Sequence, residues 1–293
     1  MTPRPGRALR HVLFATTVVH GADLVPTTDG IRLPGAGDRP GGDIEVGWDR
    51  LTEALDPIGT EDSQAPARLA RWLRQRRWVA EAPELLLADA ARVVGLPVTS
   101  SVHPGRGWVV ERVPGDALDL GLGVRGLDPA APEAVELVAP SVWADADLDP
   151  RAWWRAAVEQ LEAMGALALH RWLRRPEAPL RPLGDADVVT LLGSSSFRRG
   201  LAERHGGMLA AVVPMRTRGW LSLSAVDPAF APTAAALTEP EHRGFDRPVL
   251  VTAEEVALAG RGRWAYAATV AGLLPTPDLD AARRTAGAGR RLP

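Results

Sequence analysis

The segment most suggestive of chemistry is LLGSSSFRRG, residues 191–200, in which a glycine, three serines and two arginines follow an apolar run. Backbone N–H groups at the start of a helix are free and attract anions. Serine hydroxyls add donors, and arginine contacts phosphate or carboxylate oxygens in pairs. The segment therefore predicts an anion-binding loop, whose candidate residues are Gly193, Ser194, Ser195, Ser196, Arg198 and Arg199.

Two other interpretations of this segment stay open. A serine that caps a helix needs no ligand, and the segment lacks the glycine patterns of a P-loop and of a dinucleotide fold. A serine nucleophile needs a histidine that is oriented by a carboxylate. The chain offers residues of these types: Ser195, His205 or His242, and Asp227 or Asp246. GSSSF also lacks the second glycine of a nucleophile elbow, which argues against the nucleophile. We therefore place a helix cap first, an anion site second and a nucleophile third.

The histidines and carboxylates form no recognisable metal site. The chain has no cysteine, which excludes disulfides, thiolate catalysis and Cys-ligated zinc. HGAD (20–23) and EPEHRGFD (239–246) combine histidine with acids, but neither has the spacing of a zinc site or a calcium loop. The acids of DADLD (145–149) precede a helix, whose positive end accounts for them. We therefore expect no metal and no cofactor, and we assign no catalytic residue.

A second candidate site is the basic stretch ARLARWLRQRRW, residues 67–78, which has helical spacing and five arginines. Basic residues interleaved with an aromatic residue are what binding to a phosphate backbone and a stacked base would need. The candidate partner-binding residues are Arg71, Arg74, Arg77 and Trp78. Residues 128–149 carry six acids and no base, so the basic helix is expected to face that segment, within the molecule or across an interface. We therefore place arginines that are solvated or paired internally first, a partner protein second and a nucleic acid third, since the net charge of the chain is −2.

Composition indicates a soluble globular protein. The chain has 293 residues, of which 46% are hydrophobic and 24% charged, and disordered chains do not have this balance. All 34 basic residues are arginine, which is typical of a GC-rich bacterial genome. No apolar run reaches the roughly 18–20 residues that a membrane span needs. The apolar run at 12–19 is short and lacks a signal-peptide cleavage site, so we expect a buried first strand there and a cytoplasmic protein.

Residues 1–178 are predicted to form an N-terminal α+β lobe. It is expected to contain the first strand at 12–19, helices at 46–55, 65–80 and 83–94, a β-hairpin around the turn at 104–107 and a long helix at 150–175. Asp149 suits the N-cap of that long helix and Pro150 its first position. Apolar residues at spacings of three and four predict a buried helix face that includes Trp154, Leu161 and Trp172.

A proline-rich stretch separates this lobe from a second one, predicted as a C-terminal α/β lobe at 183–262. Its expected strands are 187–192, 208–214 and 247–251, with another after Trp220, and its expected helices are 195–204, one from Asp227, and 252–260 capped by Thr252. Residues 275–293 are rich in Ala, Gly and Arg and predict a disordered tail. Strands interleaved with helices predict an α/β or α+β fold of mixed sheets in two lobes.

These features favour a non-enzymatic interaction or accessory module of a larger intracellular bacterial assembly. Ten tryptophans, opposite charge patches and the lack of a catalytic motif support this hypothesis. The expected partner is another protein of the same system, and neither a membrane nor a nucleic acid is expected to be one. The alternative is a small-molecule α/β enzyme or binding protein that recognises a phosphate or carboxylate group at the 193–199 loop.

Overall fold

A computed structural model describes residues 6–35, 42–56, 59–81, 88–104, 108, 110–128, 131–145, 149–176, 178–221 and 230–259. Asp227 and the predicted tail at 275–293 lie outside the described residues. The described helices are α1 (Arg7–His20), α2 (Trp48–Ala54), α3 (Ala65–Glu81), α4 (Pro140–Asp145), α5 (Pro150–Leu173), α6 (Val188–Leu191), α7 (Ser195–Arg204) and α8 (Phe230–Leu237), with short 3₁₀ turns η2 (Ala88–Ala90) and η5 (Pro240–His242). Among these helices, none combines the length and apolar character that crossing a bilayer requires.

The strands within the described residues form three antiparallel sheets, so the fold is mixed α+β. The first sheet contains β1 (Val25–Pro26), β2 (Gly30–Leu33) and β3 (Ile44–Gly47). The second contains β4 (Ala91–Pro97), β6 (Leu118–Arg125) and β5 (Glu111–Arg112), with β7 (Val135–Leu137) also paired to β6. The third has the order β11 (Val256–Leu258), β10 (Val249–Thr252), β8 (Met208–Met215) and β9 (Arg218–Trp220).

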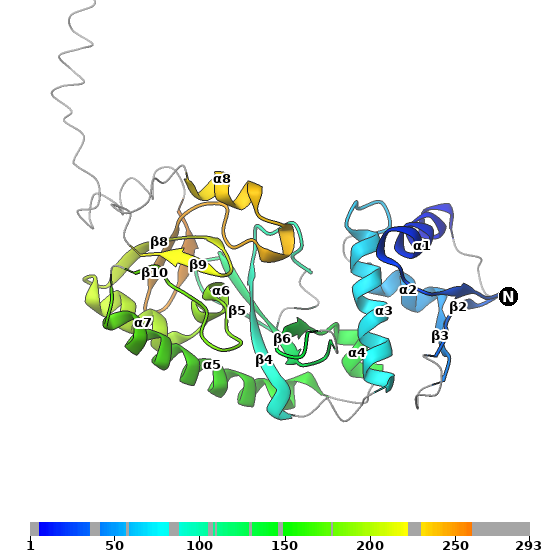
Figure 1. The fold of residues 1–293 in the computed structure, drawn as a ribbon, viewed down its shortest axis with the longest axis horizontal. Coiled ribbons are helices and arrows are strands. Elements are labelled where there is room, and N and C mark those ends of the chain that lie inside the picture. Colours follow the sequence, from blue (N-terminus) through cyan, green and yellow to red (C-terminus); the bar gives the residue numbers. More distant parts are fainter. Residues whose placement is uncertain are drawn as a thin grey trace, which may run out of the picture.

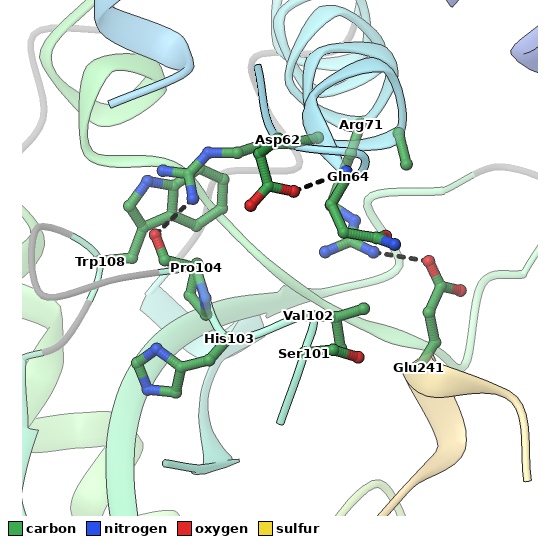
Figure 2. Close-up of a pocket in the computed structure, with 11 residues that line it drawn as sticks. Asp62, Gln64, Arg71, Ser101, Val102, His103, Pro104, Trp108 and Glu241 are labelled. Carbon is green, nitrogen blue, oxygen red and sulfur yellow. Dashed lines mark hydrogen bonds and ion pairs between the residues drawn. The ribbon is translucent and has the colours of Figure 1, made fainter. Parts of the chain in front are cut away.

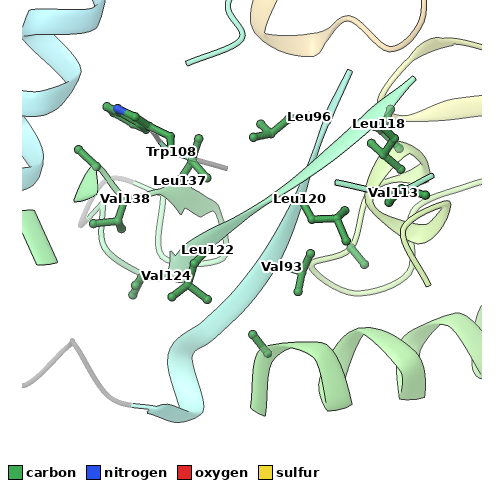
Figure 3. Close-up of a cluster of buried hydrophobic side chains, with 14 of the residues drawn as sticks. Val93, Leu96, Trp108, Val113, Leu118, Leu120, Leu122, Val124, Leu137 and Val138 are labelled. Atoms are coloured by element: carbon green, nitrogen blue, oxygen red, sulfur yellow. The ribbon is translucent and has the colours of Figure 1, made fainter. Parts of the chain in front are cut away.

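The long helix α5 packs against the second sheet and against α7, and α7 packs in turn on the third sheet. The helices α1, α2 and α3 and the first sheet gather at one end of the molecule (Figure 1). Side chains of β4 and β6 form a dense part of the core, and Figure 3 shows Val93, Leu120 and Leu122 between these strands and the helix below them. β6 is buried along almost its whole length, because β4, β5 and β7 pair with it within the sheet and α5 packs against it.

The predicted long helix is confirmed. Asp149 caps α5 by accepting a hydrogen bond from the N–H of Arg151 at 2.9 Å, and Pro150 is its first residue. Leu161 and Trp172 are buried as the apolar stripe predicts. Trp154 lies on the same stripe near the start of the helix, where it is only half-buried and packs against the edge of the core.

Two apolar segments predicted as strands are helices. Residues 12–19 belong to α1, whose buried residues Leu9, Val12, Leu13 and Thr16 recur at helical spacing and pack against α3. The β-branched residues of this run favour a strand locally, but the packed helix face outweighs that preference. Residues 187–192 form the short helix α6, because the Asp187 side chain accepts the N–H of Thr190 at 2.7 Å and so caps a turn.

Two segments predicted as helices contain strands. Within the predicted helix 83–94, residues 82–87 lie outside the described residues and Ala91–Pro97 form β4, which pairs along its whole length with β6. Within 252–260, Thr252 does accept the N–H groups of Glu254 and Glu255, but the result is a tight turn into β11 rather than a helix. Long-range pairing therefore overrides the local helix signals.

One contiguous hydrophobic cluster runs from Leu9 to Val256 and contains residues of both predicted lobes. α5 packs against β4 before the predicted boundary and against α7 after it. Val256 also accepts the backbone N–H of Ala117 at 3.1 Å, which joins the third sheet to the second. The division into lobes at about residue 180 stays a prediction.

Candidate functional site

The candidate anion-binding loop is the start of α7, as predicted. Ser194 is the N-cap residue, and its fully buried hydroxyl accepts the backbone N–H of Phe197 at 3.2 Å. Ser196 Oγ lies 3.0 Å from Ser194 Oγ. The loop therefore has the local geometry of a capped helix N-terminus, whose remaining N–H groups are available to an acceptor.

That acceptor is a side chain of the protein itself. The carboxylate of Glu162, on α5, accepts the backbone N–H of Ser195 at 2.7 Å and that of Ser196 at 2.9 Å. It also accepts the hydroxyl of Ser194 at 2.9 Å. Burial raises the pKa of Glu162, but the hydrogen bonds from these three serines outweigh that effect and hold the pKa below its ordinary value. Glu162 thus takes the position in which a bound anion would lie.

The two arginines of the loop do not converge on one point. Arg198 is buried and donates hydrogen bonds to the carbonyl oxygens of Leu192 and Gly193, at 2.8 and 2.7 Å. Burial lowers the pKa of its guanidinium, an effect that Glu162 opposes. Arg199, by contrast, is exposed. Arg198 therefore serves the turn between α6 and α7, and only Arg199 is free to meet solvent.

The residues of the nucleophile hypothesis are not brought together. His205 ends α7, at the far end from Ser195, and its Nδ1 lies 2.8 Å from the carbonyl oxygen of Leu201. Asp246 interacts with Thr99 and Arg247. Among the described residues, no histidine or aspartate lies within hydrogen-bonding distance of the Ser195 hydroxyl.

Two arginines of the basic helix α3 point into the molecule. Arg68 donates to the carbonyl oxygens of Ala54, Pro104 and Asp56 at 3.0, 2.5 and 2.6 Å, and its guanidinium lies 5.0 Å from the ring centre of Trp108. Burial lowers the pKa of Arg68 to about 10. The second, Arg76, forms an ion pair with Asp145.

The predicted contact with the acidic segment 128–149 is therefore confirmed inside the molecule. Asp145 accepts a hydrogen bond from Arg50 at 2.6 Å in addition to its ion pair with Arg76. A second acid of the segment, Glu136, has its pKa raised by burial, an effect that Arg71 and Arg74 oppose. Part of the positive charge of α3 is thus balanced internally.

Arg71 bridges α3 to a distant part of the chain, at a cleft shown in Figure 2. Its guanidinium donates to Glu241 of η5 at 2.6 Å, across the cleft that Gln64, Ser101 and His103 also line. The cleft holds about 50 Å³, which is small beside the roughly 300–1,000 Å³ of ordinary ligand sites. Its shape suits a link between segments better than a ligand site.

His103 lines the same cleft, but its imidazole interacts with a different part of the chain. In Figure 2 its imidazole points away from the Arg71–Glu241 pair. Its Nε2 lies 3.2 Å from the fully buried carboxylate of Asp119, to which Arg112 also donates at 2.7 and 3.0 Å. Burial lowers the pKa of His103, and Asp119 opposes this effect. The arrangement fastens the 100–104 loop to β6.

The other partner-binding candidates, Arg74, Arg77 and Trp78, line one pocket of about 260 Å³. The pocket lies between the C-terminal end of α1 and the outer side of α3, and it also contains His20, Asp23, Leu33 and Leu73. Arg74 is exposed, and Arg77 donates to the carbonyl oxygen of Pro34 at 2.5 Å. Within the described part of the chain, neither guanidinium has a carboxylate within 4.0 Å.

His20 and Asp23, which the sequence offers as possible metal ligands, belong to this pocket. No group of three or more metal-ligating side chains occurs among the described residues. The sequence indicated Arg74 and Arg77 as binding residues. It did not indicate the α1 side of the pocket, because residues 12–19 were predicted to form a strand.

Comparison of the chain with protein-family models, with curated proteins and with solved structures gives no match.

Proposed function

We propose that the protein is a non-enzymatic interaction module that binds an acidic, partly apolar segment of another protein. The binding site is the pocket between α1 and α3. The observation that carries the proposal is that Arg74, Arg77 and Trp78 line one pocket and that, among the described residues, no carboxylate is paired with either arginine. In this proposal the partner belongs to the same intracellular bacterial system.

The chemistry of the pocket suits a carboxylate next to an apolar side chain. Two guanidinium groups at one opening favour acidic residues, and arginine and tryptophan are the residues that most often dominate protein interfaces. Leu33 and Leu73 are buried and form the apolar base of the pocket, and the half-buried Trp78 supplies apolar contact area. Asp23 is the one acid among the lining residues, so the pocket keeps a net positive charge.

The outer face of α1 extends this site. Phe14, Val18 and Val19 are 67%, 64% and 72% exposed, and the helix that carries them ends at His20 in the pocket. Large apolar side chains gathered on one exposed helix face are typical of an interaction surface. A partner segment with acids at one end and apolar residues along its length would cover both the pocket and this face.

A protein partner is preferred to a nucleic acid because few of the arginines are available. Binding of a nucleic-acid backbone rests on many phosphate contacts. On α3, Arg68 is committed to carbonyl oxygens, while Arg71 and Arg76 are paired with Glu241 and Asp145. The alternative of a small-molecule site at the 193–199 loop is not favoured, since Glu162 already accepts the N–H groups there.

The test uses a fluorescein-labelled synthetic helical peptide with Glu and Leu on one face, and a matched peptide with Gln in place of Glu. Anisotropy at low salt is expected to show binding of the Glu peptide alone, and the affinity should fall as salt is added. The double variant Arg74→Glu/Arg77→Glu should abolish binding. Arg204→Glu, a change at an exposed arginine of α7, should leave binding unchanged.

Three results would contradict the proposal. The first is equal binding of the Glu and Gln peptides, which would mean that charge recognition is absent. The second is undiminished binding by the double variant, which would place the peptide elsewhere. The third is tighter binding of a single-stranded oligonucleotide than of the peptide, lost in the same variant, which would assign the surface to nucleic acid.

A further inference from the structure

A second pocket, of about 220 Å³, lies where α5 ends. Its floor is apolar and includes Ala168, Leu180 and Phe197, all of which are buried. Three exposed arginines surround this floor: Arg171, Arg175 and Arg181. The pocket is separate from the one on α3 and shares no residue with it.

The arginines of this second pocket have no internal counter-charge among the residues that the structure describes. Within that part of the chain, no carboxylate lies within 4.0 Å of Arg171, Arg175 or Arg181. The C-terminal end of α5 contributes the equivalent of about half a negative charge. Three guanidinium groups exceed that amount several-fold, so an anion in the pocket would be attracted rather than repelled.

A buried donor also lacks an acceptor. Trp172 lines the pocket, its side chain is 7% exposed, and its Nε1–H has no hydrogen-bond partner among the described residues. Its ring packs against His205, with the ring centres 5.8 Å apart. Buried N–H groups without a partner are rare, because they forfeit the hydrogen bond that water would provide. The Nε1 atom is itself shielded from solvent, so it adds a partial positive charge beside the pocket and no direct contact with its contents.

We propose that this pocket binds a small organic carboxylate with an apolar body. The three arginines neutralise and hold the carboxylate, and the floor covers the apolar body. The volume is below the range of about 300–1,000 Å³ typical of sites for larger ligands, which limits the body to a ring or a short chain. Inorganic phosphate would leave the apolar floor uncovered.

The test is a calorimetric titration of the full chain at low ionic strength with phenylacetate. Phenylacetamide, acetate and inorganic phosphate serve as probes that lack the charge or the apolar body. Phenylacetate is expected to bind at least about tenfold more tightly than each of the other three, because it alone meets both the arginines and the floor.

Variants separate the pocket from the general positive charge of this surface. Arg175→Gln/Arg181→Gln should weaken phenylacetate binding about tenfold or more. Arg174→Gln, an exposed change on the same turn outside the lining, should not alter it.

The proposal is overturned if millimolar phenylacetate produces no binding heat, or if the double arginine variant binds it as well as the wild type does. It is also overturned if phosphate or acetate binds as tightly as phenylacetate, because the floor would then play no part. The outcome does not depend on the peptide experiment, since the two pockets share no residue.

Discussion

The carboxylate of Glu162 on α5 caps α7 by accepting the backbone N–H of Ser196 at 2.9 Å, across 34 positions of sequence. The same carboxylate accepts the N–H of Ser195 and the hydroxyl of Ser194. The serine loop therefore has the chemistry of an anion cradle, and the protein supplies the anion. This contact makes the start of α7 a junction between α5 and the third sheet, against which α7 also packs.

The first prediction concerns the pH dependence that this carboxylate confers. Its folded-state pKa lies below the ordinary value of 4.5, so the stabilisation is present above pH 4.5 and is lost as the pH falls through the folded-state pKa. Glu162→Gln removes the charge and should lower the free energy of unfolding by about 1 kcal/mol at pH 7. Urea unfolding from pH 7 to pH 3 should show a shallower decline in the variant than in the wild type. Parallel declines would mean that Glu162 is not the group responsible.

The second prediction concerns Gly165, one turn after Glu162. A Cβ atom at this position would collide with Ser194 Oγ and would lie 2.6 Å from Ser194 Cβ. Gly165→Ala should therefore destabilise the protein by about 1–3 kcal/mol, although alanine is intrinsically the better helix former. Ala166→Gly, on the exposed side of the same helix, should also destabilise, by about 1 kcal/mol. If thermal unfolding shows Gly165→Ala to be stabilising, the close approach of α5 to Ser194 is incorrect.

The third prediction separates buried from exposed arginines on α3. Arg68→Met removes the donor to three carbonyl oxygens and should cost about 3 kcal/mol or more, because buried acceptors are left unpaired. Arg71→Met removes only a partly exposed ion pair with Glu241, whose carboxylate is 63% exposed, and should cost less than about 1 kcal/mol. Chemical unfolding of the two variants measures the difference. Equal costs would show that Arg68 has no special structural role.

The features that were predictable from sequence are those set by neighbouring residues. Asp149 and Pro150 mark the start of α5, and the Ser194 cap marks the start of α7, because each acts within its own first turn. The stripe through Leu161 and Trp172 follows from helical periodicity alone. These signals are local, so tertiary packing did not have to be known.

The features that were missed depend on contacts between distant segments. Residues 12–19 become a helix because α1 packs on α3, and Ala91–Pro97 become a strand because β6 lies beside them. Glu162 could not be linked to the serine loop, since nothing in its sequence context marks it as a cap for another helix. Gly165 was the available hint, as a glycine within a buried stripe often marks a close approach. The ion pairs of α3 also depend on distant residues, because Glu241 pairs with Arg71 and Asp145 pairs with Arg76. The sequence around α3 therefore does not show which of its arginines can bind a partner.

The last prediction tests whether the serine loop keeps its affinity for anions when its own carboxylate is removed. In the wild type, millimolar phosphate or formate should not raise the melting temperature through this loop, because Glu162 accepts the N–H groups of Ser195 and Ser196. Glu162→Ala leaves those N–H groups facing an open position at the positive end of α7, where a small anion can bind and stabilise the fold by mass action. Formate is therefore expected to raise the melting temperature of Glu162→Ala at constant ionic strength, and more than it raises that of the wild type. Ser194→Ala, which retains Glu162, is the matched control and should show no such rescue. If formate has the same effect on all three proteins, the loop is a helix cap with no intrinsic anion affinity.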